Sequence, residues 1–333
     1  MSSLPAAPDP IAATPASASA EATTRIAAQA AQAAATRGWL LGLLGVAVFA
    51  LTIPMTRLAT GPLEAPQLPA AFVAVGRAAL AGLLAAAWLI AVRAPWPTAR
   101  QWRGLALTAS GVVFGFPLCL GWAVERVDAA HAAVVSGLLP LATAVIGTLL
   151  AGQRAPARFW ACAALGTALV LGYAALQGGA RLQLGDAWLA AAVLWGGFGY
   201  VMGARLSAPA ADGRPGLAPE QVISWVVVGC LPITLPLALW LAPEPATWGA
   251  VRPAAWGAFV YLAVGSMWLG FFAWYRGLAL GGMLRVSQVQ LLQPFLSMLL
   301  AVPVLGEALD AVTVACGLAV MATVAVSRRV GTR

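Results

Sequence analysis

Charged residues are scarce in this sequence and make up only 9% of its 333 residues. A soluble domain usually carries about a quarter charged residues, whereas 61% of this chain is apolar. Too few polar side chains are present to cover a water-facing surface, which excludes an ordinary soluble fold. We predict an all-α integral membrane protein whose natural solvent is the lipid bilayer.

Lysine is absent, histidine occurs once, and the four cysteines all fall inside apolar runs. The cysteines lack the spacing of metal ligands, so the sequence predicts no metal site and no cofactor. All 19 basic residues are arginines, scattered singly between apolar runs. This scatter is typical of membrane topology signals and disfavours nucleic acid as a partner. A Gly-x-x-x-x-Gly-Lys-Ser/Thr phosphate loop is also missing, which argues against an ATP-driven pump.

Apolar runs of the length needed to cross a membrane, about 20 residues, occupy most of the chain. We predict ten transmembrane helices, near residues 39–58, 67–92, 104–124, 131–151, 157–177, 186–206, 220–242, 255–275, 285–305 and 310–327. Residues 1–37 precede them and are rich in Ala, Pro, Ser and Thr without hydrophobic periodicity. Such a composition predicts a disordered tail, in which IAAQAAQAAA (26–35) could form a short helix.

The arginines also predict the orientation of these spans. Only Arg57, Arg126, Arg181 and Arg252 fall in loops on the side opposite the N-terminus, and Arg77 lies within a run. All the others fall on the N-terminal side, and cytoplasmic segments are the ones enriched in arginine. We therefore predict a multi-pass protein of the cell inner membrane, with the tail and the C-terminal end (329–333) both cytoplasmic.

One predicted helical segment occurs twice in the sequence. The first copy begins at residue 131 and reads HAAVVSGLLPLATAVIGTLLAGQ. The second begins 154 residues later and reads RVSQVQLLQPFLSMLLAVPVLGE, with the same Val, Leu, Pro and Gly at four equivalent positions. The offset spans five helices, and a repeat with an odd number of spans inserts upside down relative to its partner. We predict two inverted five-helix repeats, 38–178 and 179–328, with a substrate site at mid-membrane between them.

The two copies place polar side chains and a proline on one helix face, at positions i, i+4 and i+7. Such a face should point at protein or water, because unpaired polar groups are costly in hydrocarbon. The hydroxyls of Ser136, Thr143 and Ser297 suit packing between helices as well as they suit the lining of a cavity. The amides of Gln290 and Gln293 favour a cavity, because two large amides on one short arc exceed what packing requires. The predicted substrate-binding residues of these faces are Ser136, Thr143, Gln290, Gln293 and Ser297, and the predicted kinks lie at Pro140 and Pro294.

Three other side chains are candidates for function. Arg77 lies mid-way along the second span, where an arginine costs about 2.5–3.5 kcal/mol on insertion scales. Two interpretations are open: backbone carbonyls satisfy it, or it binds a substrate carboxylate. Trp195 is predicted either as a cavity wall or as core packing. His131 begins the fourth span, where we expect it to be solvated, with a proton relay as the alternative.

Taken together, these features resemble the drug/metabolite transporter superfamily, EamA type. The resemblance covers residues 38–327 and includes the mid-span prolines, the arginine of the second span, and the Gly306–Glu307 end of the second copy. It implies a ten-helix fold with a central cavity and the movement of small metabolites, often amino acids, often outward. The first copy departs from the family by ending in Gly152–Gln153, so a structural acid is expected only at Glu307.

We therefore expect a secondary transporter, an exporter of small metabolites such as amino acids, that works by alternating access as a monomer or homodimer in the bilayer. A facilitator or exchanger of another small solute, such as a sugar, nucleoside or drug, is the alternative. A membrane-embedded enzyme is disfavoured, because one histidine, scattered cysteines and no deep acid supply no catalytic cluster. A scaffold or sensor that moves no solute is a third possibility.

Overall fold

A computed structural model describes residues 15–150, 156–177, 183–207, 216–281 and 288–331, and every regular element in these residues is a helix. The first half contains α1 (Pro15–Ala50), α2 (Thr52–Thr60), α3 (Ala70–Ala91), α4 (Ala99–Ala109), η1 (Ser110–Gly115), α5 (Phe116–Val124), α6 (Ala129–Ser136), α7 (Leu139–Leu150) and α8 (Ala157–Gln177). The second half contains α9 (Leu184–Ser207), α10 (Pro219–Leu241), η2 (Pro245–Ala250), α11 (Pro253–Tyr261), η3 (Leu262–Leu269), α12 (Gly270–Gly281), η4 (Gln288–Leu292), α14 (Gln293–Leu305) and α15 (Ala311–Gly331).

These helices follow the predicted spans closely, and the all-α membrane fold is confirmed. In the described part of the chain, seven helical stretches are long and apolar enough to cross a membrane. Shorter apolar helices, Trp160–Tyr173, Gln293–Leu305 and Ala311–Thr323, occupy the places of the predicted fifth, ninth and tenth spans. Several spans consist of two or three elements in line, since α4, η1 and α5 together form Ala99–Val124.

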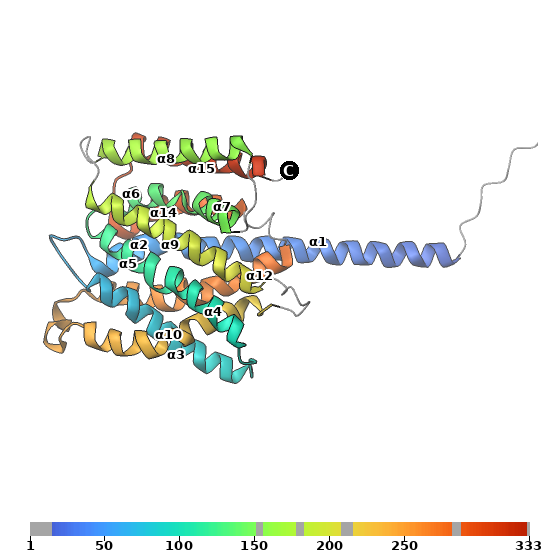
Figure 1. The fold of residues 1–333 in the computed structure, drawn as a ribbon, viewed down its shortest axis with the longest axis horizontal. Coiled ribbons are helices and arrows are strands. Elements are labelled where there is room, and N and C mark those ends of the chain that lie inside the picture. The colour runs from blue at the N-terminus through green and yellow to red at the C-terminus, as the bar shows by residue number, and fades with distance from the viewer. Residues whose placement is uncertain (1–14, 151–155, 178–182, 208–215, 282–287, 332–333) are drawn as a thin grey trace, which may run out of the picture.

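The prediction of a disordered tail is wrong for residues 15–36, because α1 begins at Pro15 and runs unbroken into the first span. Figure 1 shows this helix projecting well beyond the bundle. Alanine, which dominates the segment, has the highest helix propensity of all residues. The membrane helix also supplies the nucleus on which these turns extend, so they avoid the cost of starting a helix.

The packing of the helices follows a pseudo-two-fold pattern between the halves. Helix α1 of the first span packs along α12 of the eighth, and α9 of the sixth span packs along α4, η1 and α5 of the third. The second span packs on the seventh (α3 with α10), the fourth on the ninth (α6 with α14), and the fifth on the tenth (α8 with α15). Each contact therefore either has a counterpart in the other half or joins two equivalent spans.

Regular helix is interrupted at matching places in the two halves. The third span of each half contains a π-helical segment, η1 or η3. In the fourth span α6 ends at Ser136 and α7 begins at Leu139, and α14 begins 154 residues later at Gln293, after the 3-10 turn η4. The predicted kink prolines, Pro140 and Pro294, each lie at the second residue of the new helix, a position that tolerates the missing N–H.

Glycines allow the third and sixth spans to cross almost backbone to backbone. A Cβ on Gly111 would lie 2.4 Å from the carbonyl oxygen of Trp195 and 2.6 Å from the Cα of Gly199. The counterpart crossing of α1 with α12 is similar, because a Cβ on Gly277 would lie 2.6 Å from the amide nitrogen of Gly42. Small residues at such crossings let membrane helices approach closely.

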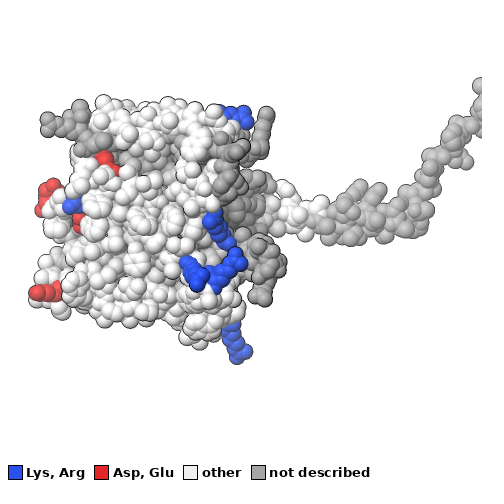
Figure 2. All heavy atoms as spheres, viewed as in Figure 1, with Lys and Arg blue, Asp and Glu red and all other residues white. Residues whose placement is uncertain are grey.

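Charge divides the bundle into two ends, which Figure 2 shows on opposite sides of the molecule. We call one the acidic end, after Glu64, Glu125, Asp128, Asp186, Glu244, Glu307 and Asp310. The other is the arginine end, after Arg37, Arg93, Arg100, Arg103, Arg158, Arg205 and Arg276. Helix α1 projects from the arginine end and α15 finishes there (Figure 1).

Buried polar contacts join the two halves at the acidic end. His131 of α6 is not solvated as predicted: it is buried, and its Nε2 lies 2.7 Å from Oδ1 of Asp186 on α9. The carboxylate of Glu307, just after α14, accepts hydrogen bonds from the backbone N–H groups of Ala129 (2.8 Å) and Ala130 (2.9 Å) at the start of α6. It therefore caps a helix of the other half, consistent with the structural role expected for Glu307.

Glu307 should make the stability of the protein depend on pH. Burial raises the pKa of its carboxyl above the ordinary value of 4.5 and outweighs the two N–H donors, which lower it. Because the folded protein holds this proton more tightly than the unfolded chain, the group contributes its full stabilisation below pH 4.5. The contribution is lost as pH rises through the raised pKa of the folded protein. We expect the stability advantage of the wild type over Glu307→Gln to shrink across that window, in melting curves of detergent-solubilised protein.

Glu64→Gln, at an exposed acid of the same end, controls for the loss of one carboxylate. An advantage of the wild type that grew with pH would mean that the two N–H donors outweigh burial.

Candidate substrate site

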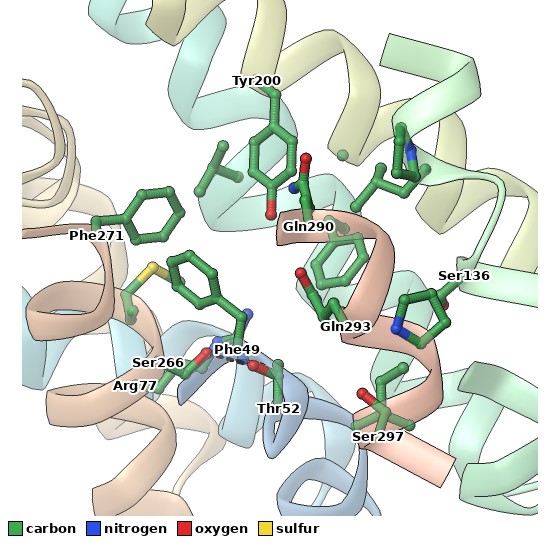
Figure 3. Close-up of a pocket in the computed structure, with 18 residues that line it drawn as sticks. Phe49, Thr52, Arg77, Ser136, Tyr200, Ser266, Phe271, Gln290, Gln293 and Ser297 are labelled. Atoms are coloured by element: carbon green, nitrogen blue, oxygen red, sulfur yellow. Dashed lines mark hydrogen bonds between the residues drawn. The ribbon is translucent and has the colours of Figure 1, made fainter. Parts of the chain in front are cut away.

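A cavity lies between the two halves, at the breaks in the fourth and ninth spans (Figure 3). Both halves contribute polar side chains to it, and aromatic rings form part of its wall. The lining residues are Phe49, Thr52, Ile53, Arg77, Val112, Phe116, Ser136, Leu139, Pro140, Gly196, Tyr200, Ser266, Met267, Phe271, Gln290, Gln293, Pro294 and Ser297.

The helix breaks explain why the two matched segments meet at this place. Ser136 is the last residue of α6, and Gln290, its counterpart in the repeat, lies in the 3-10 turn before α14. Each proline is the second residue of the next helix and also lines the cavity. Irregular backbone at membrane depth is tolerated where it is buried in protein or lines a cavity, so the kinks and the cavity occur together.

Three side-chain atoms at the cavity are buried without a hydrogen-bond partner in the described part of the chain: Oγ of Ser136, Oε1 of Gln293 and Nε of Arg77. Buried polar groups are nearly always paired, and each exception calls for an explanation. A solute that binds in the cavity and pairs with these atoms supplies one.

Hydroxyl groups at the cavity also join the first span to the second half. Ser297 of α14 donates to the carbonyl oxygen of Ala50 at 2.7 Å, where α1 ends. Thr52 of α2 shares a 2.8 Å hydrogen bond with Ser266 of η3. The α1–α2 junction is therefore held by two spans of the other half, one of them at its π-helical segment.

Five of the seven predicted substrate-binding residues line this cavity: Arg77, Ser136, Gln290, Gln293 and Ser297. Thr143 does not line the cavity: it donates to its own helix at the Leu139 carbonyl and lies where α7 crosses Gly197 of α9, as the packing interpretation of this hydroxyl expects. Trp195 does not line the cavity either: its side chain is 42% exposed and packs over Gly115 of the third span, which agrees with helix packing, the alternative to a cavity wall. Both side chains belong to the contact between the fourth, third and sixth spans.

Sequence reasoning missed several lining residues, among them Phe49, Thr52, Tyr200, Ser266 and Phe271. Tyr200 and Phe271 belong to aromatic clusters of the sixth and eighth spans, and this clustering was a usable signal. Thr52 and Ser266 gave none, because single hydroxyls are common in membrane helices that pack together.

The chemistry of the lining is that of a binding site for a small polar solute. It combines one cation, two amides and several hydroxyls with apolar and aromatic walls, and no acid lines it within the described residues. Those residues also hold no group of three His, Cys, Asp or Glu side chains placed to bind a metal ion. The site offers hydrogen bonds and one positive charge.

The chain matches one protein family twice, at residues 36–175 and 183–329, and that family is described as the EamA-like transporter family. The chain belongs to the EamA-like transporter family. The double match reflects the duplication read from the sequence, and the predicted resemblance to EamA-type transporters is confirmed.

Individual relatives agree with this assignment. The "Uncharacterized transporter YdeK" of Bacillus subtilis (strain 168) is 43% identical over 294 residues, covering 88% of this chain and 98% of the relative. The "Inner membrane protein YtfF" of Escherichia coli (strain K12) is 36% identical over 97 residues, or 28% of this chain and 30% of the relative. One crystal structure of 20% sequence identity matches with a TM-score of 0.59, covering 90% of this chain and 99% of that one, and shows the shared fold.

This EamA-like protein is therefore a multi-pass membrane transporter. Family membership places the cavity between the halves in a transport protein, where a solute has to be held and released.

Proposed function

We propose that this chain is an inner-membrane secondary transporter that exports small metabolites, such as amino acids, by alternating access. The observation that carries the proposal is the cavity itself, which lies where the two matched, kinked helices of the halves meet. Secondary transporters built from inverted repeats bind solute near the membrane midplane between the repeats.

The two halves also differ at equivalent positions, which supports alternating access. Ser297 donates to a carbonyl of the first span, whereas its counterpart Thr143 donates within its own helix. In a repeat transporter one half adopts one conformation while the other half adopts a second, and exchanging the two moves the opening across the membrane. Unequal partners at matched hydroxyls are what such an arrangement requires.

Charge supports the proposed orientation. Arginines gather at the end from which α1 projects, and cytoplasmic segments are enriched in arginine. We therefore assign the arginine end and both chain ends to the cytoplasm and the acidic end to the outer side. The name of the relative, inner membrane protein YtfF, is in keeping with an inner-membrane location.

Counterflow in reconstituted vesicles tests the function. Purified protein, in vesicles preloaded with one unlabelled amino acid at a time, is expected to accumulate the same labelled amino acid transiently for at least one of the twenty. Vesicles that carry an unrelated membrane protein control for leakage. Counterflow with none of the amino acids, but with a sugar, nucleoside or cationic drug, would contradict the proposed substrate class and favour the alternative.

A facilitator or exchanger is the second candidate, and one observation favours it. Proton-coupled carriers commonly keep an intramembrane carboxylate, and none lines the cavity within the described residues. Uptake into vesicles with an imposed pH gradient separates the two: an exporter driven by protons concentrates its solute, whereas a facilitator only equalises it.

A further inference from the structure

We propose that Arg77 binds the carboxylate, or another compact oxyanion, of the solute that occupies the central cavity. The inference rests on the proposed transport function and extends it, because it assigns the charge class of the substrate to a named side chain. The sequence left two interpretations of Arg77 open, and the structure distinguishes between them.

Arg77 is a buried cation without an anion. It is only 4% exposed, and among the described residues its Nε has no hydrogen-bond partner and no acid forms an ion pair with it. The acids that the structure describes lie at helix ends and in loops, away from the middle of α3. Because buried charges are normally paired, and Nε makes no bond to a carbonyl, the cavity lacks the negative group that would complete it.

Two hydroxyls stand beside this cation. Figure 3 shows Thr52 and Ser266 gathered with Arg77 on one side of the cavity, joined by their 2.8 Å hydrogen bond. A hydroxyl pair of this kind uses one of its two protons, so the other can be donated to a ligand. The guanidinium presents a planar fork of donors that matches the two oxygens of a carboxylate. Together these groups form the donor set of an anion subsite.

The opposite side of the cavity is polar but uncharged. Figure 3 places Gln290, Gln293 and Ser136 there, and Oε1 of Gln293 and Oγ of Ser136 are buried without a partner among the residues that the structure describes. An amide and a hydroxyl can each hydrogen-bond an ammonium or hydroxyl group of a solute. Since no acid lines the cavity in the described part of the chain, a solute with only a positive charge would find repulsion from Arg77 and no counter-charge. The favoured ligands are therefore carboxylates, zwitterions included.

The first arm of the test measures stability without any ligand. Arg77→Met removes a buried charge that has no partner, so the melting temperature of the ligand-free protein should rise or stay unchanged. Arg57→Met is the matched control, because Arg57 donates to the Val124 carbonyl and lies 3.7 Å from Asp128, and its loss should lower the melting temperature. If Arg77→Met destabilised the protein as much as Arg57→Met, Arg77 would be a structural residue and the proposal would fall.

The second arm compares solutes that share a skeleton but differ in charge. The probes are valine, isovalerate and isobutylamine, and phenylalanine, 3-phenylpropionate and phenethylamine, each tested for binding to the purified protein and for counterflow in vesicles. We expect binding of carboxylate-bearing members and none of the amines. Arg77→Gln should weaken carboxylate binding by about tenfold or more, the usual effect of losing a charged hydrogen bond, and Arg77→Lys should retain part of it.

The outcomes separate this proposal from the function on which it rests. Carboxylate binding that depends on Arg77, without counterflow, would uphold the anion subsite and reject transport. Counterflow of the amines that persists in Arg77→Gln would uphold transport and overturn the anion subsite. The proposal also falls if none of the four carboxylates binds, or if Arg77→Gln weakens every probe equally.

Discussion

Ser136→Phe is expected to reduce solute flux through reconstituted protein to the level of protein-free vesicles. Ser136 ends α6 at the cavity, and its hydroxyl has no partner among the described residues. A phenyl ring at this position would occupy the space in which the proposed solute is held. Counterflow of the amino acid that the wild type transports is the measurement, alongside the melting curve of each variant.

Two substitutions control for the effects of size and of the lost hydroxyl. Ser136→Ala removes the hydroxyl but leaves the space, so most of the flux should remain. Leu149→Phe adds a ring to α7 of the same span at a side chain that is 63% exposed in the protein alone, where lipid should accommodate it. If Leu149→Phe stopped flux as completely as Ser136→Phe, or if Ser136→Phe had no effect, the cavity would not be the path of the solute.

Gly111→Ala is expected to destabilise the protein by about 1–3 kcal/mol or more, as overpacking of a close contact does. The new Cβ would lie 2.4 Å from a carbonyl oxygen and 2.6 Å from a Cα of α9. Both are backbone atoms, so no side chain can rotate to relieve the clash. Urea titration or thermal melting of the detergent-solubilised protein measures the loss.

Gly172→Ala is the matched control, because nothing lies within 4 Å of a Cβ at this position of α8. Alanine is the better helix former by about 1 kcal/mol, so this variant should be as stable as the wild type or more stable. Equal losses in the two variants would mean that the η1–α9 crossing is looser than described.

Much of the fold could be predicted from the sequence because the bilayer imposes simple rules. Backbone polar groups in hydrocarbon must pair within their own segment, so long apolar runs become helices. The predicted second span, 67–92, and seventh span, 220–242, differ by at most three residues at either end from α3 (Ala70–Ala91) and α10 (Pro219–Leu241). The duplicated segment likewise predicted where the chain kinks, since proline cannot continue a helix that precedes it.

The candidate site could be predicted only in part, because the position of a residue along its helix does not determine which residues of other helices it contacts. Ser297 and Thr143 occupy equivalent places in the repeat, yet one hydroxyl bonds to the first span and the other to its own helix. Trp195 was predicted as a cavity wall or as core packing, and a glycine on the third span opens a place for its ring away from the cavity. The tail was misjudged for a different reason, because its composition was interpreted without the helix that it extends.

The sequence alone determined that this protein is a helical membrane protein built from two related halves, because apolar length, arginine placement and an internal repeat are properties of the chain itself. Tertiary structure decided which side chains share the cavity and which remain without partners. Helices approach one another according to the space that their side chains leave. The role of a buried charge such as Arg77 depends on whether the surrounding groups of the folded protein pair with it.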